Sequence, residues 1–64
     1  MFKYELEQTT KVNGKDIISI ETFFDYDLAI HRFYEVKEIV DTAQLYRYKE
    51  KDGKYILDIL TASF

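Results

Sequence analysis

The segment Asp25–Val40, DYDLAIHRFYEVKEIV, decides the fold because it carries the helical periodicity of the chain. Asp25 is predicted to cap the helix, and Asp27 lies in the first turn, where negative charge suits the helix dipole. We predict a helix from Tyr26 to Val40 that ends without a glycine. Its apolar residues recur at spacings of four, three and four and define one face: Ala29, Phe33, Val36 and Val40, with Tyr26 and Ile30 beside them.

Two hairpins flank this helix along the chain. The only two glycines lie in Asn13-Gly14 and Asp52-Gly53, and such pairs between alternating apolar residues mark tight hairpin turns. Each turn needs a positive φ, which glycine adopts without strain. The pattern predicts four strands, over residues 2–10, 15–23, 43–51 and 54–62.

The first hairpin allows two registers. A two-residue loop would place Ile20 on the charged side of the sheet, opposite Glu7. A three-residue loop over residues 12–14 pairs Leu6 with Ile20 instead, and it keeps Ile18 and Ile20 on an apolar face. We therefore predict the three-residue loop, built from a type I turn and a glycine bulge.

The second hairpin favours a two-residue type I′ turn at Asp52-Gly53. That register places Arg47 opposite Asp58, so that opposite charges face each other across the strands. Tyr48 then opposes Leu57, and Tyr46 opposes Ile59. One face carries Tyr46, Tyr48, Tyr55, Leu57 and Ile59, whereas the other carries Leu45, Ile56 and Leu60. A single helix covers only one of these faces.

The sequence as a whole predicts an α+β fold of order ββαββ, a four-stranded antiparallel sheet with one helix packed on one face. With 64 residues the chain forms one small domain, residues 1–64. It has no cysteine and one histidine, which excludes disulfides and Cys/His zinc sites. Stability must therefore come from a core, predicted to contain Tyr4, Leu6, Ile18, Ile20, Ala29, Phe33, Val36 and Val40.

No residue pattern points to catalysis. His31 lies on the polar side of the helix between Asp27 and Glu35, and we interpret it as an exposed histidine. Glu21, Asp25 and Asp27 lack the spacing of a calcium loop, so capping and dipole stabilisation are favoured. There is no glycine-rich strand–helix junction to bind phosphate. We expect no enzymatic activity, no cofactor and no metal site.

Charge is unevenly distributed. Residues 16–41 hold seven acids and two bases, a net charge of −5 within a total of −3. The polar face of the helix and the end of the helix form a predicted acidic surface made of Asp27, Glu35, Glu38 and Asp41. This surface is either solvated or docked on a basic protein. The basic residues near the second turn alternate with tyrosines and suit a single nucleic-acid strand, but the acidic balance makes nucleic acid the weaker option.

The aromatic residues suggest a function in binding. Six tyrosines and five phenylalanines exceed what one short helix on one sheet needs to bury, and tyrosine is enriched at interfaces. The predicted partner-binding residues are Tyr46, Tyr48, Tyr55, Leu57 and Ile59. We expect a small acidic non-catalytic protein-binding module of the inhibitor or adaptor type, from a phage or other mobile element. We also expect a homodimer, with the tyrosine-bearing hairpin in the contact.

Two alternative functions remain open. The first is a single-stranded nucleic-acid binder that uses the Tyr/Lys-rich second hairpin. The second is a small ligand-binding protein or enzyme whose site forms across a dimer interface. The N-terminal residues show no apolar segment of a secretory signal, and no apolar run is long enough to span a membrane. We expect a cytoplasmic location and no association with membranes.

Overall fold

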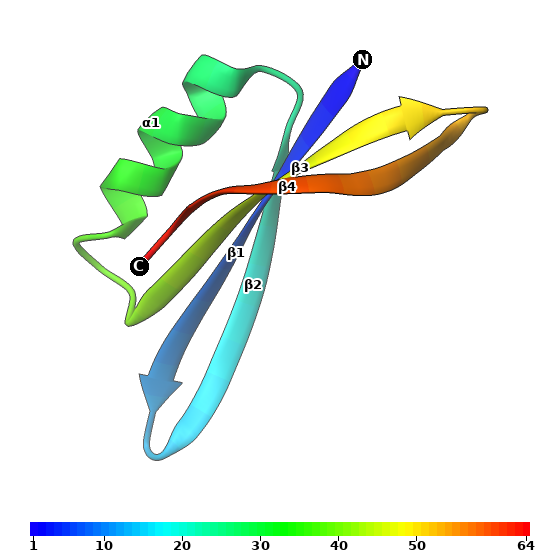
Figure 1. Ribbon diagram of the computed structural model, residues 1–64. Helices are drawn as coiled ribbons and strands as arrows, with labels where there is room; N and C mark the ends of the chain where they lie inside the picture. The colour runs from blue at the N-terminus through cyan, green and yellow to red at the C-terminus, as the bar shows by residue number, and fades with distance from the viewer.

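The computed structural model describes residues 1–64 and has the predicted order ββαββ, with all strands in one antiparallel sheet (Figure 1). The strand order is β2-β1-β3-β4, so the two hairpins meet through their first strands, and β2 and β4 form the edges. The predicted α+β class is confirmed. The elements are β1 (Phe2–Val12), β2 (Lys15–Phe23), α1 (Tyr26–Val36), β3 (Thr42–Lys51) and β4 (Lys54–Ser63).

Helix α1 lies along one face of the sheet, and the two hairpin tips extend beyond it at opposite ends of the molecule (Figure 1). The antiparallel pairing of β1 with β3, from Phe2 opposite Lys49 to Thr9 opposite Thr42, places the tips there. The molecule is elongated as a result, with dimensions of 43 × 21 × 14 Å. A short helix on a long sheet leaves much of the sheet without a covering element.

Helix α1 begins as predicted and ends earlier than predicted. Asp25 has extended backbone, and its carboxylate accepts the amide hydrogen of Leu28 at 3.2 Å, which confirms the N-cap. The helix ends at Val36 rather than Val40, although the amide of Val40 still bonds the carbonyl of Val36 at 3.0 Å. The amide of Asp41 bonds the carbonyl of Thr9 in β1 at 3.0 Å, and this long-range contact directs the chain into β3.

The first hairpin has a two-residue turn, so the predicted three-residue loop is wrong. Asn13 and Gly14 both have positive φ, 52° and 79°, as a type I′ turn requires. Leu6 pairs with Glu21 rather than with Ile20, and Ile20 pairs with Glu7. This register is tolerated because the Glu21 carboxylate is satisfied by hydrogen bonds from helix and sheet side chains, described below.

The second hairpin has the predicted two-residue turn, in which Asp52 and Gly53 have φ of 53° and 78°. Tyr48 pairs with Leu57 as predicted. Further from the turn the register shifts twice, so Arg47 pairs with Ile59 and the predicted pairing of Tyr46 with Ile59 is wrong. Each shift inserts an extra residue into β4, and β-bulges of this kind bend edge strands.

The core lies between α1 and the two central strands. Seven apolar residues are buried there: Tyr4, Leu6, Ala29, Phe33, Val36, Ala43 and Leu45. Five of the eight predicted core residues are among them, and Val40 is half-buried against this cluster. The prediction that Ile18 and Ile20 belong to the core is wrong, because each side chain is 59% exposed. The two-residue turn places them on the side of the sheet away from α1.

Candidate protein-binding face

The sheet has one face under α1 and one face without a covering element, which we call the open face. Tyr4 and Leu6 of β1 are buried beneath α1, so the alternate residues Lys3, Glu5 and Glu7 belong to the open face. Residues paired across the strands share a side of the sheet. The register therefore adds Ile18 and Ile20 of β2, Tyr46 and Tyr48 of β3, and Leu57 and Leu60 of β4.

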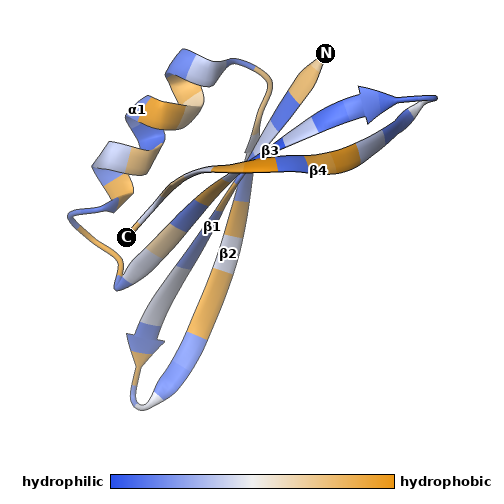
Figure 2. Ribbon diagram, viewed as in Figure 1, coloured by the Kyte–Doolittle hydropathy of each residue, from blue (hydrophilic) through white to orange (hydrophobic).

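The open face is apolar at both edges and charged along its middle. Figure 2 shows hydrophobic segments along β2 and β4, the two edge strands. Between them run the charged residues of β1. The apolar side chains at the β4 edge remain exposed, with Leu57 at 54% and Leu60 at 48%. The tyrosines Tyr46 and Tyr48 beside them are half-buried. An exposed apolar strip with a polar border is the usual composition of a protein-binding surface.

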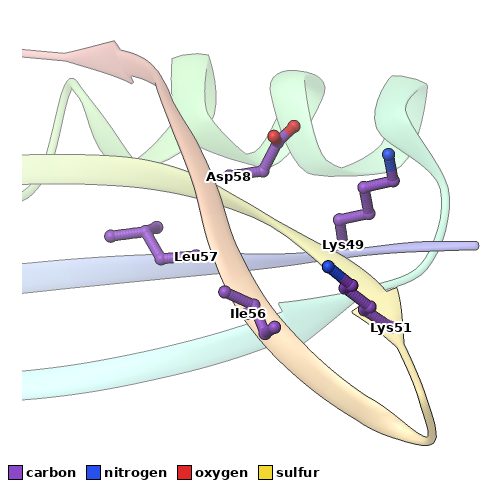
Figure 3. Close-up of a pocket in the computed structure, with 5 residues that line it drawn as sticks. All are labelled: Lys49, Lys51, Ile56, Leu57 and Asp58. Carbon is purple, nitrogen blue, oxygen red and sulfur yellow. The ribbon is translucent and has the colours of Figure 1, made fainter.

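The structure brings together four of the five predicted partner-binding residues. Tyr46, Tyr48 and Leu57 share the open face, and Tyr55, opposite Glu50, follows on the same side. Ile59 belongs to the helix side, because it pairs with Arg47. Leu57 and Asp58 leave β4 on opposite sides (Figure 3). The extra residue in β4 at this point reverses the alternation, and Leu60 takes the place predicted for Ile59.

Lys3 and Phe24 complete an aromatic cluster that sequence reasoning missed. The Lys3 ammonium lies 5.1 Å from the ring centroid of Tyr48 and 4.7 Å from that of Tyr55, within reach of cation–π attraction. The rings of Phe24 and Tyr55 are 6.5 Å apart. The alternation of apolar and charged residues in the sequence predicted that Lys3 lies on the charged side of its strand, with Glu5 and Glu7. Its contact with the tyrosines depends on the pairing of β1 with β3, which no local pattern revealed.

The surroundings of Tyr48 raise the pKa of its phenol above the ordinary value. Desolvation raises the pKa of Tyr48, and the Glu5 carboxylate, the Tyr46 phenol and the Glu7 carboxylate raise it further. Each of these neighbours disfavours a negative charge on the Tyr48 oxygen. The Tyr48 hydroxyl, which lies beside these two carboxylates, therefore keeps its proton to a higher pH than an ordinary tyrosine.

The predicted acidic surface has two parts. Asp27, Glu35 and Glu38 are exposed on α1 and on the turn that follows it. Asp41 is also exposed, but its carboxylate accepts the amide hydrogen of Lys11 at 2.6 Å. Asp41 therefore holds the end of β1 where β3 no longer pairs with it. His31 is exposed on the same helix, as predicted.

A polar cluster joins α1 to the sheet. The Arg32 Nε donates to both carboxylate oxygens of Glu21, at 3.1 and 3.2 Å, and the Gln8 side-chain amide donates to the same carboxylate. Arg32 also lies 3.9 Å from the Glu35 carboxylate. These groups are paired with one another, so the cluster stabilises the packing of α1 on β1 and β2.

The structure holds one shallow cavity, at the β3–β4 hairpin (Figure 3). Its volume is about 210 Å³, below the range of about 300–1,000 Å³ usual for small-molecule sites. Its one carboxylate, Asp58, pairs with Arg47 at 2.6 Å. The residues that line it are Lys49, Lys51, Ile56, Leu57 and Asp58.

No group of three or more His, Cys, Asp or Glu side chains is arranged to hold a metal ion. Helix α1, with 11 residues, is too short to cross a membrane. Comparisons with protein-family models, with curated proteins and with solved structures gave no match. The open face is therefore the candidate site on the strength of its own geometry.

Proposed function

We propose that this chain is a small non-catalytic protein-binding domain that captures its partner on the open face of the sheet. The observation that carries the proposal is the exposure of Leu57 and Leu60 beside the half-buried pair Tyr46 and Tyr48. Large aromatic side chains next to exposed aliphatic ones supply apolar area together with hydroxyl groups for hydrogen bonds. Residues of this kind dominate the binding energy of protein interfaces.

The charges beside this strip indicate the chemistry of the partner. Glu5 and Glu7 lie in the middle of the open face, and across the β1–β3 pairing Glu5 is opposite Tyr46 and Glu7 is opposite Gln44. A fitting partner places an apolar side chain over Leu57 and Leu60 and a basic side chain over the two glutamates. Opposite charges across an interface speed association and favour the right partner over wrong ones. An adaptor or an inhibitor needs such a surface and no catalytic group.

Two neighbouring residues of β4 provide a sharp test. Leu60 belongs to the open face and Ile59 to the helix side, yet their exposed fractions are nearly equal, 48% and 51%. We expect Leu60→Lys to abolish capture of the partner that wild type retrieves from source-cell lysate. With the purified partner, calorimetry is expected to show a loss of affinity of at least about tenfold.

Ile59→Lys is the matched control, because it adds the same charge to the same strand on the other side of the sheet. We expect it to bind like wild type, and circular dichroism should show that both variants are folded. Equal binding by Leu60→Lys and wild type would refute the open face as the site. Equal loss in both variants would show that the edge of β4, and not its open face, makes the contact.

A second candidate function is single-strand nucleic-acid binding. The observation that favours it is the Lys3 ammonium above the rings of Tyr48 and Tyr55, which adds a cation to two surfaces on which bases stack. Retention on single-stranded DNA that weakens as salt rises, and that Lys3→Ala reduces, would support this candidate. Absence of retention at low salt would reject it.

A further inference from the structure

The two edges of the sheet differ in the regularity of their backbones. The pairing of β3 with β4 is interrupted by two register shifts, and such bulges are a common means of protecting an edge strand. The pairing of β1 with β2 runs without a shift from Val12 opposite Lys15 to Tyr4 opposite Phe23. The edge at β2 is therefore a regularly paired strand of nine residues without a bulge.

The register shows which backbone groups of β2 are free. In a two-residue hairpin the residues that flank the turn, here Val12 and Lys15, bond to each other, and bonded pairs then alternate along the strands. The amides of Glu50 and Lys11 support this alternation. The Glu50 amide bonds the carbonyl of Met1, and the Lys11 amide bonds the Asp41 carboxylate. The odd residues of β1 therefore direct their backbone N–H and C=O groups toward β3 and away from β2. The even residues of β2 thus direct their N–H and C=O groups outward: Asp16, Ile18, Ile20 and Thr22.

The side chains of this edge are apolar where an edge is normally charged. Ile17, Ile18 and Ile20 are 54–59% exposed, and no charge lies between Asp16 and Glu21. No proline interrupts the strand. An apolar edge without a bulge is a template for pairing with another strand.

We propose that two copies of this chain pair their β2 strands antiparallel, about a two-fold axis at Ser19, to form one continuous sheet from two sets of four strands. In this register Ile18 of each copy forms a hydrogen-bonded pair with Ile20 of the other. The even residues, whose backbone groups point outward, supply every bond of the new ladder. The proposal does not depend on the open face binding a separate partner.

The pattern of β2 favours this register over its neighbours. Centring the axis on Ile18 would place Asp16 opposite Ile20 of the second copy, and centring it on Ile20 would place Ile18 opposite Thr22. Only the Ser19 axis pairs each isoleucine of the open face with an isoleucine. It also brings Lys15 diagonally across from Glu21 of the second copy, an attraction repeated by symmetry. The edge is thus complementary to itself in backbone, apolar side chains and charge.

The stability of the domain gives a physical reason for this contact. Only seven apolar residues form the core of the isolated chain, and no disulfide adds to them. Small domains of this size commonly gain the missing stability from a partner subunit. Pairing through β2 buries isoleucines that α1 does not reach.

Cysteine scanning tests the register directly, because the natural chain has no cysteine. In the proposed dimer the two copies of Ser19 form a non-hydrogen-bonded pair, whose Cα atoms lie about 4.5 Å apart, within the range of a disulfide. Under mild oxidation Ser19→Cys should form a covalent dimer. Ile17→Cys is the matched control, because residue 17 lies on the same side of the strand as Ser19 but is opposite Glu21 of the second copy. Ile17→Cys should therefore not form a covalent dimer. Equal cross-linking at both positions, or cross-linking at Ile18 or Ile20 instead, would overturn the register.

The oligomeric state is tested with a proline that spares the fold. The N–H of Ile18 points outward, so Ile18→Pro removes no hydrogen bond to β1 and is tolerated as edge-strand prolines are. Light scattering at micromolar concentration should give twice the 7.7 kDa chain mass for wild type and for Ile18→Thr, and the chain mass for Ile18→Pro. A monomeric wild type at every concentration, or a dimeric Ile18→Pro with native circular dichroism, would refute the proposal.

Discussion

The Arg47 guanidinium lies 2.6 Å from the Asp58 carboxylate, although the backbone partner of Arg47 is Ile59. The ion pair survives because the extra residue that β4 gains at this point is Asp58 itself. The side chain of Arg47 also lies over the ring of Phe2, at 4.5 Å. This bulge keeps the charges together, sends Ile59 to the helix side and puts Leu60 on the open face.

The Arg47–Asp58 pair should contribute little to stability. Both side chains are about one-third exposed, so solvent screens their attraction. A double-mutant cycle with Arg47→Ala and Asp58→Ala is expected to give a coupling of about 0.5–1 kcal/mol, which decreases as salt increases. A coupling that does not change with salt would show that the pair acts through packing on Phe2 rather than through charge.

Glu21→Leu tests why the first hairpin has its register. The substitution makes the helix side of β2 more apolar, but it removes the acceptor of Arg32 and of Gln8. Because the site is only partly buried, we expect a destabilisation of about 1 kcal/mol in urea denaturation. The double variant Glu21→Leu/Arg32→Met should recover part of this loss, since no unpaired charge remains. A single variant more stable than wild type would contradict the role of the cluster.

Phe33→Ala should remove much of the stability of the domain. Phe33 is 3% exposed and lies edge-on to Phe64 with a centroid distance of 5.5 Å. Deleting a buried aromatic ring costs about 3–5 kcal/mol, out of a total that is small in a chain of this length. Its neighbour Tyr34, which is 59% exposed, serves as the control, and Tyr34→Ala should change the denaturation midpoint much less. Similar shifts in both variants would contradict the assignment of the core.

Gly53→Ala should weaken the second hairpin through backbone strain alone. Gly53 has φ of 78°, and a Cβ built there meets no atom within 4 Å, so no clash contributes. A left-handed conformation costs an L-residue about 1–2 kcal/mol, and Gly53→Val should cost more because its side chain is β-branched. Urea denaturation measures the effect, with Lys54→Ala as the control. Unchanged stability in Gly53→Val would mean that this turn is frayed in solution.

Tyr48 should make stability fall at high pH. Its pKa is raised above the ordinary value of 10.0 in the folded chain, so the folded state binds the phenol proton more tightly than the unfolded state. The resulting stability is complete below pH 10 and is lost as the pH rises through the folded pKa. Urea denaturation across this range should show a smaller decrease for Tyr48→Phe than for wild type. Tyr34→Phe, at an exposed helix position, is the control and should behave like wild type.

The features that the sequence determined are those set by neighbouring residues. Asp25 caps α1 because its carboxylate reaches an amide three residues away, and Asp52-Gly53 forms its turn because both residues tolerate positive φ. The order of the elements and the helical stripe with Phe33 at its centre follow from the same local periodicity. Most of the candidate site, including Tyr46, Tyr48 and Leu57, was also predictable, because β3 alternates regularly throughout and β4 does so from the turn to Leu57.

The tertiary structure decided the features that depend on partners far along the chain. Glu21 lies on the side of α1, where Arg32 and Gln8 donate to its carboxylate, and the register that places it there exposes Ile18 and Ile20. After the helix ends at Val36 the Asp41 amide bonds the Thr9 carbonyl of β1, and Lys3 reaches Tyr48 because β1 pairs with β3. Each of these outcomes depends on contacts between segments far apart in the chain, which no periodicity in the sequence records.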